Sequence, residues 1–242
     1  MNIVICKTAE DAARSAAVLF AGQVIQKPNS ILGLATGGTA VPVYSELIKM
    51  YKDGTINFSD VITFNLDEYV GLPRTNEQSY YYFMHDNLFN HVNINPENVH
   101  LPDGMAADLE AECLAYENAI NTAGGIDMQL LGIGHNGHIA FNEPSDQFTD
   151  ITNVVSLKES TIEANKRFFE NADMVPRRAI SVGIGTIMRA RKIVMVITGE
   201  GKSDITRSLL TGAITPNLPA SALKLRENVT VIIDEAAASK LN

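Results

Sequence analysis

The sequence has no run of about 18 consecutive apolar residues, which is the length that a membrane-spanning helix requires. Its first residues, Met1 to Ile5, also lack the positively charged stretch that precedes the apolar stretch of a secretory signal. We therefore expect a cytoplasmic protein that has no membrane partner.

Lysine and arginine are scarce, with 19 such residues against 28 Asp and Glu and a formal net charge of -9. No basic stripe interrupts this acidic chain, and its long-range field repels nucleic acid and acidic membrane surfaces. We therefore expect no nucleic-acid partner. A small anionic ligand would need local positive potential, which helix N-termini and a few placed Lys or Arg side chains can supply.

Cysteine is also scarce. The two cysteines, Cys6 and Cys113, have no spacing that suggests a disulfide or a metal site, and we expect both to be buried free thiols. The chain has no internal repeat, no low-complexity tract and no long linker rich in proline, glycine or serine. With 242 residues, of which 45% are hydrophobic, it is long enough for one core, so residues 1–242 are predicted to form a single domain.

Short apolar runs alternate with helical stretches along the whole chain. The runs that predict strands are Ile3–Cys6, Ile31–Ala35, Val61–Leu66, Met128–Ile133, Val154–Leu157, Ala179–Ile184, Ile193–Thr198 and Val229–Asp234. The stretches that predict helices are Ala9–Gln26, Pro42–Tyr51, Tyr80–Asn90, Ala107–Ala123, Glu159–Phe169 and Lys202–Leu210. This alternation predicts an α/β fold, a Rossmann-like three-layer sandwich with a mainly parallel central sheet. Ligands bind such sheets at the carboxyl ends of the strands, so the functional residues should follow the strands.

The most polar interval of the chain is Lys158–Arg178, where charged positions alternate with apolar ones. We interpret the surrounding segment, residues 153–182, as a flap that covers a cleft. An ordinary surface helix is the alternative.

A glycine pair follows the strand predicted at Ile31–Ala35, in the order Thr36, Gly37, Gly38, Thr39, and helical sequence comes next. Glycine lets the backbone approach a ligand closely, while two hydroxyls and the amides of the helix start can donate to phosphate oxygens. The alternative is a tight turn in which Thr39 only caps the helix.

A second turn of this kind, Gly199–Lys202, follows the strand predicted at Ile193–Thr198. Lys202 could place a point charge on a phosphate group, although a lysine in the first turn of a helix is usually solvated. Two glycine-bearing turns between a strand and a helix in one acidic chain favour a shared site for one phosphate.

Two adjacent carboxylates, Asp67 and Glu68, stand where the strand Val61–Leu66 emerges. Successive side chains of a strand point to opposite faces. We therefore expect one of the two to face the cleft and the other to be structural.

The loop after Met128–Ile133 holds the densest group of reactive side chains. His138 can exchange a proton near neutral pH, and Glu143 could orient or charge its ring, so the two form a plausible acid/base couple. His135, His138 and Glu143 could also be drawn as metal ligands, but histidines so spaced on a glycine-rich loop do not enforce a tetrahedral set. We expect no metal. A Ser-His-Asp triad is disfavoured because the sequence has no Gly-x-Ser-x-Gly elbow.

Three blocks in this order closely resemble the glucosamine-6-phosphate deaminases: Leu32–Thr39, Phe64–Leu72 and Gly132–Pro144. Residues Ala164–Phe169 continue the pattern, and the resemblance spans essentially the whole chain. It implies a substrate, an amino-sugar phosphate, that the spacing of residues does not reveal. It also implies isomerisation and deamination of glucosamine 6-phosphate to fructose 6-phosphate and ammonia, in amino-sugar catabolism, without a cofactor.

The resemblance also assigns roles to residues of this chain. Asp67 would move a proton between sugar carbons C2 and C1, while His138 and Glu143 would open the pyranose ring. The phosphate would be held by the first glycine turn and by Lys202, together with Arg167, which the flap would carry. Some family members have Asp in place of Asn136, and Asn can orient a neighbour by hydrogen bonding but cannot carry charge or act as a base.

Two other proteins of similar fold are the alternatives. A 6-phosphogluconolactonase needs no proton shuttle between carbons, and its histidine loop has a Ser-Leu-Phe-Pro ending where this chain has Phe141–Pro144. A sugar-phosphate-sensing domain of a transcriptional regulator needs a DNA-binding extension, whereas here the first strand begins at about residue 2. Allosteric family members have a longer C-terminus and basic residues near Asn153 and Val155. We therefore expect a monomer or low oligomer that N-acetylglucosamine 6-phosphate does not activate.

Overall fold

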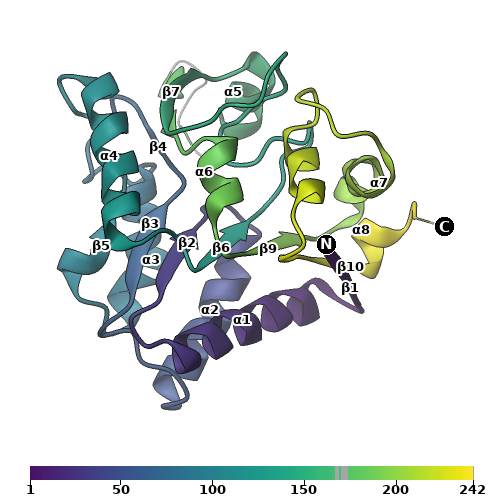
Figure 1. The fold of residues 1–242 in the computed structure, drawn as a ribbon, viewed down its shortest axis with the longest axis horizontal. Helices are drawn as coiled ribbons and strands as arrows, with labels where there is room; N and C mark the ends of the chain where they lie inside the picture. Colours follow the sequence, from purple (N-terminus) through teal and green to yellow (C-terminus); the bar gives the residue numbers. More distant parts are fainter. Residues whose placement is uncertain (167–168, 170–173, 242) are drawn as a thin grey trace.

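The computed structural model describes residues 1–166, 169 and 174–241. Its central sheet has seven strands in the order β1-β10-β9-β6-β2-β3-β5, and all of the pairings are parallel (Figure 1). The strands are β1 (Asn2–Cys6), β2 (Ile31–Leu34), β3 (Ile62–Asn65), β5 (Val99–His100), β6 (Met128–Leu131), β9 (Lys192–Ile197) and β10 (Val229–Asp234). The predicted α/β fold with a mainly parallel sheet is confirmed.

Helices link the strands and cover both faces of the sheet, with α1 and α2 on one face and α4 and α6 on the other (Figure 1). The α-helices are α1 (Ala9–Gln26), α2 (Ala40–Lys52), α3 (Tyr80–Asn87), α4 (Leu109–Ala123), α5 (Glu159–Asn165), α6 (Ile184–Arg189), α7 (Ser203–Thr211) and α8 (Glu235–Ala238). Short 3-10 helices lie at Phe89–His91, Pro96–Asn98, Glu200–Lys202 and Pro219–Leu225. In the described part of the chain, the structure contains no helix with the length and apolarity needed to cross a membrane.

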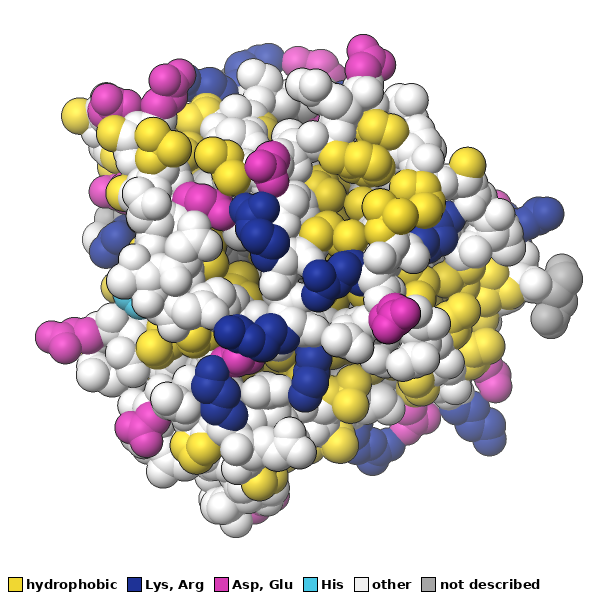
Figure 2. Space-filling model, viewed as in Figure 1, with side chains coloured by type: hydrophobic (Ala, Val, Ile, Leu, Met, Phe, Trp, Pro, Cys, Tyr) yellow, Lys and Arg dark blue, Asp and Glu magenta, His cyan; other side chains and the backbone are white. Residues whose placement is uncertain are grey.

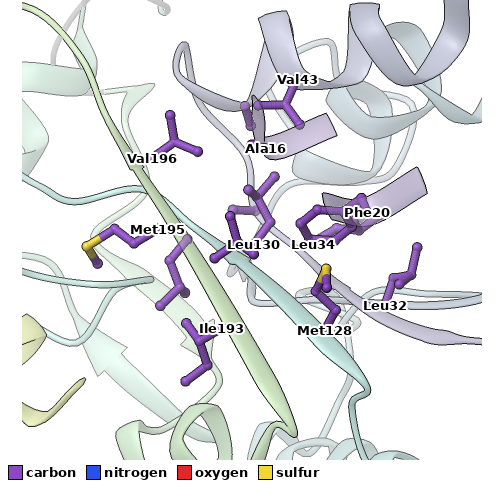
Figure 3. Close-up of a cluster of buried hydrophobic side chains, with 14 of the residues drawn as sticks. Ala16, Phe20, Leu32, Leu34, Val43, Met128, Leu130, Ile193, Met195 and Val196 are labelled. Atoms are coloured by element: carbon purple, nitrogen blue, oxygen red, sulfur yellow. The ribbon is translucent and has the colours of Figure 1, made fainter. Parts of the chain in front are cut away.

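The main core packs against both faces of the central sheet, and part of it lies between the sheet and the α1 and α2 layer. Figure 3 shows side chains of β2, β6 and β9, such as Leu34, Leu130 and Val196, beside Phe20 of α1 and Val43 of α2. All of these side chains are buried, which explains why the strands are apolar at nearly every position. Burial of one leucine or phenylalanine side chain contributes about 1.5–3 kcal/mol.

A second, smaller sheet was not predicted. The apolar runs at Val154–Leu157 and Ala179–Ile184 do not join the central sheet but form β7 (Asn153–Ser156) and β8 (Arg178–Ser181). These pair antiparallel with each other, and β8 pairs antiparallel with β4 (Asp67–Tyr69). Period and composition identify a strand but not its partner, so this sheet became visible only in three dimensions.

Leu66 joins the two sheets. Its amide donates to the carbonyl oxygen of Leu34 in β2, and its own carbonyl oxygen accepts from the amide of Val182, which follows β8. The chain thus leaves the central sheet at the carboxyl end of β3 and enters the small sheet directly. This junction places Asp67, the next residue, at the end of the sheet where ligands bind.

The small sheet covers its own apolar cluster. We define the second apolar cluster as the buried residues Tyr69, Phe141, Leu157, Ile162, Val175 and Ala179. Ile162 belongs to α5, so part of the predicted flap is packed rather than fully solvated. The interpretation of residues 153–182 as a flap stays a prediction.

One edge of the central sheet, formed by strand β1, is open to solvent. Strand β1 pairs with β10 on one side, and its side chains Ile3 and Ile5 are 49% and 57% exposed. Cys113 is buried as predicted, whereas Cys6 is only half-buried because it lies on this edge strand. Figure 2 shows acidic side chains spread around the rim of one face and Lys and Arg side chains gathered near its middle.

Candidate active site

A cavity of about 490 Å³ opens at the carboxyl ends of β2, β3, β6 and β9. It collects side chains from loops that are far apart in sequence. The polar residues that line it are Thr36, Thr39, Asp67, Tyr80, His135, Asn136, His138, Thr161, Thr198 and Lys202. Each of the four loops that follow these strands contributes polar side chains to the cavity.

The first glycine turn forms one wall of this cavity. Residues Thr36 to Thr39 all line it, and Gly37 has a φ of 98°, a left-handed conformation that favours glycine. Thr39 occupies the N-cap position of α2, but its side chain makes no capping hydrogen bond. Its hydroxyl therefore remains available at the start of a helix whose first amides can bind an anion.

The second glycine turn reaches the same cavity through Lys202. Gly199 has a φ of 90°, and its amide donates to both carboxylate oxygens of Asp234 at 3.0 Å, which fixes the turn. Lys202 Nζ donates to the carbonyl oxygen of Ile133 at 2.8 Å. The two turns thus face one site, as predicted. Arg167, the other predicted phosphate ligand, lies outside the described residues.

Asp67 and Glu68 point in different directions, as strand alternation predicts. Asp67 lines the cavity although only 6% of it is exposed. Glu68 turns to the start of α3, where its carboxylate accepts from the amides of Tyr69, Tyr80 and Tyr81 at 2.8, 2.9 and 2.9 Å. Asp67 therefore faces the cavity, while Glu68 is bound by backbone amides and faces away from it.

Removal of the Glu68 carboxylate is expected to destabilise the fold. Glu68→Ala leaves the amide of Tyr69 in β4 and the amides of Tyr80 and Tyr81 at the start of α3 without this acceptor, and each unsatisfied buried donor costs about 1–3 kcal/mol. We expect the free energy of unfolding to fall by roughly 3 kcal/mol or more in urea denaturation, with a smaller loss for Glu68→Gln. Equal stability of Glu68→Ala and the unmodified protein would contradict this.

Burial makes Asp67 an unusually weak acid. Loss of hydration raises the pKa of its carboxyl to about 8, and the nearby charge of Glu68 acts in the same direction. A carboxylate of this kind binds a proton far more strongly than an exposed one. Asp67 can therefore take a proton from a bound ligand as a general base and later give that proton back.

His138, Glu143 and Asn136 form a connected group on the loop after β6. Nδ2 of Asn136 donates to Oε2 of Glu143 at 2.6 Å, and the Asn136 Oδ1 accepts from the His138 amide at 3.2 Å. Nδ1 of His138 lies 3.7 Å from the same Oε2, a distance suited to an ion pair rather than a hydrogen bond. Gly134 makes room for the imidazole, because a Cβ there would lie 2.2 Å from Cε1 of His138.

The environment of Glu143 keeps this carboxyl ionised. Burial alone would raise its pKa, but His138 and hydrogen bonds from Thr161 and Asn136 outweigh burial and lower the pKa to about 2. The ring of His138 therefore lies beside a fixed negative charge. Among the residues that the structure describes, no three His, Cys, Asp or Glu side chains converge on a metal-binding arrangement.

Sequence reasoning missed three polar residues of the cavity, namely Thr198, which follows β9, and Tyr80 and Thr161. Tyr80 stands at the start of α3, and its hydroxyl lies 3.5 Å from that of Tyr69. Thr161 belongs to α5 and donates to Oε1 of Glu143. Neither Tyr80 nor Thr161 follows a strand of the central sheet, so the rule that located the other residues did not reach them.

Comparison with known proteins gives one consistent result. Residues 7–232 match the model of the family described as glucosamine-6-phosphate isomerases/6-phosphogluconolactonase. Glucosamine-6-phosphate deaminases from Clostridioides difficile (strain 630) and Thermoanaerobacter sp. (strain X514) are 55% and 52% identical to the chain. These alignments cover 100% and 99% of the chain and 97% and 94% of the two relatives.

Solved structures show the same relationship. A monomeric glucosamine-6-phosphate deaminase superposes with a TM-score of 0.97 at 44% identity, over 99% of this chain and 100% of that one. The 6-phosphogluconolactonase from Trypanosoma cruzi has a TM-score of 0.78 at 18% identity, over 100% of this chain and 97% of that one, and shows the fold alone. The chain therefore belongs to the family of glucosamine-6-phosphate isomerases and 6-phosphogluconolactonases.

Proposed function

We propose that this chain is a glucosamine-6-phosphate deaminase that converts D-glucosamine 6-phosphate to D-fructose 6-phosphate and ammonia. The observation that carries the proposal is a single cavity lined by residues of the two glycine turns, by the buried carboxyl of Asp67 and by His138, which has Glu143 beside it. The high identity to deaminases over the full length supports it. We also propose that residues 1–242 form one catalytic domain with a flap at about 153–182.

Phosphate binding positions the sugar. The amides and hydroxyls of Thr36 to Thr39 and the ammonium of Lys202 would hold the phosphate group, and Arg167 would join them from the flap. Because these contacts are remote from the reacting carbons, their binding energy can hold the open-chain sugar in place. A substrate without the phosphate should lose turnover as well as affinity.

Ring opening is the first chemical step. His138 takes the proton of the anomeric hydroxyl and delivers a proton to the ring oxygen, so that the C1–O5 bond breaks and an aldehyde forms at C1. Glu143 stabilises the imidazolium that exists between the two transfers. Asn136 keeps Glu143 in place through its 2.6 Å hydrogen bond and takes no proton itself.

The proton shuttle follows. The aldehyde acidifies the hydrogen at C2, and Asp67 removes it to form an enolamine with a double bond between C1 and C2. Asp67 then returns the proton to C1, so that C2 becomes a ketimine. Water adds to the ketimine, and the C–N bond breaks to release ammonia and fructose 6-phosphate. The overall reaction is thus a hydrolysis of a C–N bond that proceeds by isomerisation.

Incubation with glucosamine 6-phosphate tests the proposal, with ammonia and fructose 6-phosphate measured in parallel. The deaminase releases both in equal amounts. A 6-phosphogluconolactonase would instead hydrolyse 6-phosphogluconolactone, and a sensing domain would bind the sugar phosphate without turnover. Binding without release of ammonia would refute the proposed function.

The pH profile should report the titration of Asp67. Because the ionised base is the active form and burial raises its pKa to about 8, kcat/KM should rise with pH up to about 8 and level off above it. Below that point, each pH unit should lower kcat/KM by about tenfold. The titration of Glu143 should not affect kcat/KM in this pH range, since its pKa is lowered to about 2. A flat profile between pH 6 and 8 would contradict the assignment of Asp67.

We further propose that the enzyme is a monomer or low oligomer without activation by N-acetylglucosamine 6-phosphate. The uncharged residues Asn153 and Val155 support this, since basic residues would be needed there to bind the phosphate of the effector. A charged sugar phosphate does not cross membranes unaided, so we place the enzyme in the cytoplasm with its substrate. A saturation curve that steepens or shifts on addition of the effector would overturn the regulatory proposal.

A further inference from the structure

The helix α5 reaches the catalytic loop through a buried threonine. Thr161 is 6% exposed, lines the cavity and donates from Oγ1 to Oε1 of Glu143. The other oxygen of this carboxylate, Oε2, accepts from Asn136 and is the one that lies 3.7 Å from His138. The two oxygens of Glu143 therefore have different partners, and Thr161 determines which of them faces the histidine.

Packing on both sides of Thr161 fixes its position. Ile162, the next residue, is buried in the second apolar cluster. Lys158, the N-cap residue of α5, donates from Nζ to the carbonyl oxygen of Pro144 at 2.6 Å. Pro144 follows Glu143 directly in the chain, so the first turn of α5 is attached to the catalytic loop at two adjacent residues.

This arrangement restrains the last torsion of the Glu143 side chain. The torsion between the carboxylate and the carbon before it has a broad, roughly two-fold profile, so it is held by hydrogen bonds rather than by its own barrier. Asn136 holds one oxygen and Thr161 holds the other. Without the hydroxyl of Thr161, the carboxylate plane could turn and Oε2 would leave its position beside His138.

We propose that Thr161 is a positioning residue for ring opening, which orients the Glu143–His138 pair when α5 is docked on the catalytic loop. The inference rests on the proposed function, because it assigns Thr161 to one step of that reaction. It has a specific consequence: loss of the hydroxyl slows ring opening but leaves the phosphate turns and Asp67 intact. The effect should therefore fall on kcat and on pyranose substrates.

Thr161→Val removes the hydroxyl at nearly constant shape, while Thr161→Ser retains it. We expect Thr161→Val to lower kcat for glucosamine 6-phosphate about tenfold, as for loss of a hydrogen bond to a charged group, and Thr161→Ser to keep at least about half of it. KM and the inhibition constant of the acyclic 2-amino-2-deoxyglucitol 6-phosphate should change less than about twofold, since neither depends on ring opening. With substrate deuterated at C2, the isotope effect on kcat should fall toward unity in Thr161→Val, because ring opening becomes rate-limiting.

A matched control separates this role from a general loosening of α5. Arg177→Ala breaks an exposed ion pair to Glu159 on the same helix, at 3.0 Å and away from the cavity lining, and should keep full activity. The inference is overturned if Thr161→Val keeps more than half of kcat, if Thr161→Ser falls as far, or if Arg177→Ala falls with it. Thr161→Ala supplies a second test if the valine variant does not fold. Failure of the proposed function itself is seen separately, as absence of ammonia release by the unmodified enzyme.

Discussion

Asp67→Asn is expected to lower kcat for glucosamine 6-phosphate by at least about 10³-fold, because a positioned general base contributes roughly 10²- to 10⁴-fold. The amide has the same shape as the carboxylate but cannot take the proton from C2 or return it to C1. With substrate deuterated at C2, the label should stay on C2, since ring opening by His138 does not touch that carbon. Nuclear magnetic resonance of the recovered sugar measures this directly.

The same variant should lose activity but gain stability, so its thermal stability serves as a control. The pKa of Asp67 is raised to about 8 in the folded protein, whereas an unfolded aspartate has a pKa of about 3.9. Between these values the folded state holds more protons, so the carboxyl lowers stability as the pH rises through this range. We therefore expect Asp67→Asn to gain thermal stability relative to the unmodified protein from pH 5 to pH 8. Asp60→Asn, at an exposed position, should change neither property.

His138→Gln is expected to lower kcat by about 10²- to 10³-fold, because glutamine cannot exchange a proton with the anomeric hydroxyl or the ring oxygen. Ring opening then becomes the slow step. The isotope effect seen with C2-deuterated substrate should shrink toward unity, whereas exchange at C2 should persist in the small amount of open-chain sugar that forms unaided. This pattern distinguishes His138 from Asp67, whose loss abolishes exchange.

A second histidine provides the comparison for this variant. His91 is exposed, lies outside the cavity lining and contacts the carbonyl oxygen of Asp86 at 2.7 Å. His91→Gln should keep full activity and a full isotope effect. An unchanged isotope effect in His138→Gln would place His138 outside ring opening and remove the role proposed for Glu143 as well.

Local patterns in the sequence were informative wherever a residue follows a strand of the central sheet. The apolar runs at β2, β6 and β9 are long enough to identify, and the carboxyl ends of parallel strands meet at one edge. Thr36, His138 and Lys202 could therefore be assigned to one site from their order alone. The alternation of side chains along a strand likewise predicted that Asp67 and Glu68 would part, although not which of them would face the cavity.

Contacts between distant segments could not be read in this way. Tyr80 enters the cavity because Glu68 binds the amides at the start of α3, and Thr161 enters it because Ile162 packs into the second apolar cluster. Strand β8 pairs with β4 and β7 rather than with the central sheet. None of these contacts produces a periodic pattern or a regular spacing of residues in the sequence, because they depend on side-chain packing between elements that are far apart in the chain.

By itself, then, the sequence determined the alternating strands and helices, the two glycine turns and the candidates for the reactive side chains, because each depends on residues that are close together in the chain. Only the tertiary structure decided how those side chains act. The raised pKa of Asp67 requires burial at the junction of two sheets, and the lowered pKa of Glu143 requires the neighbouring His138 together with hydrogen bonds from Thr161 of α5 and from Asn136. Desolvation and hydrogen bonding are properties of a folded environment, and no stretch of the chain contains them before it folds.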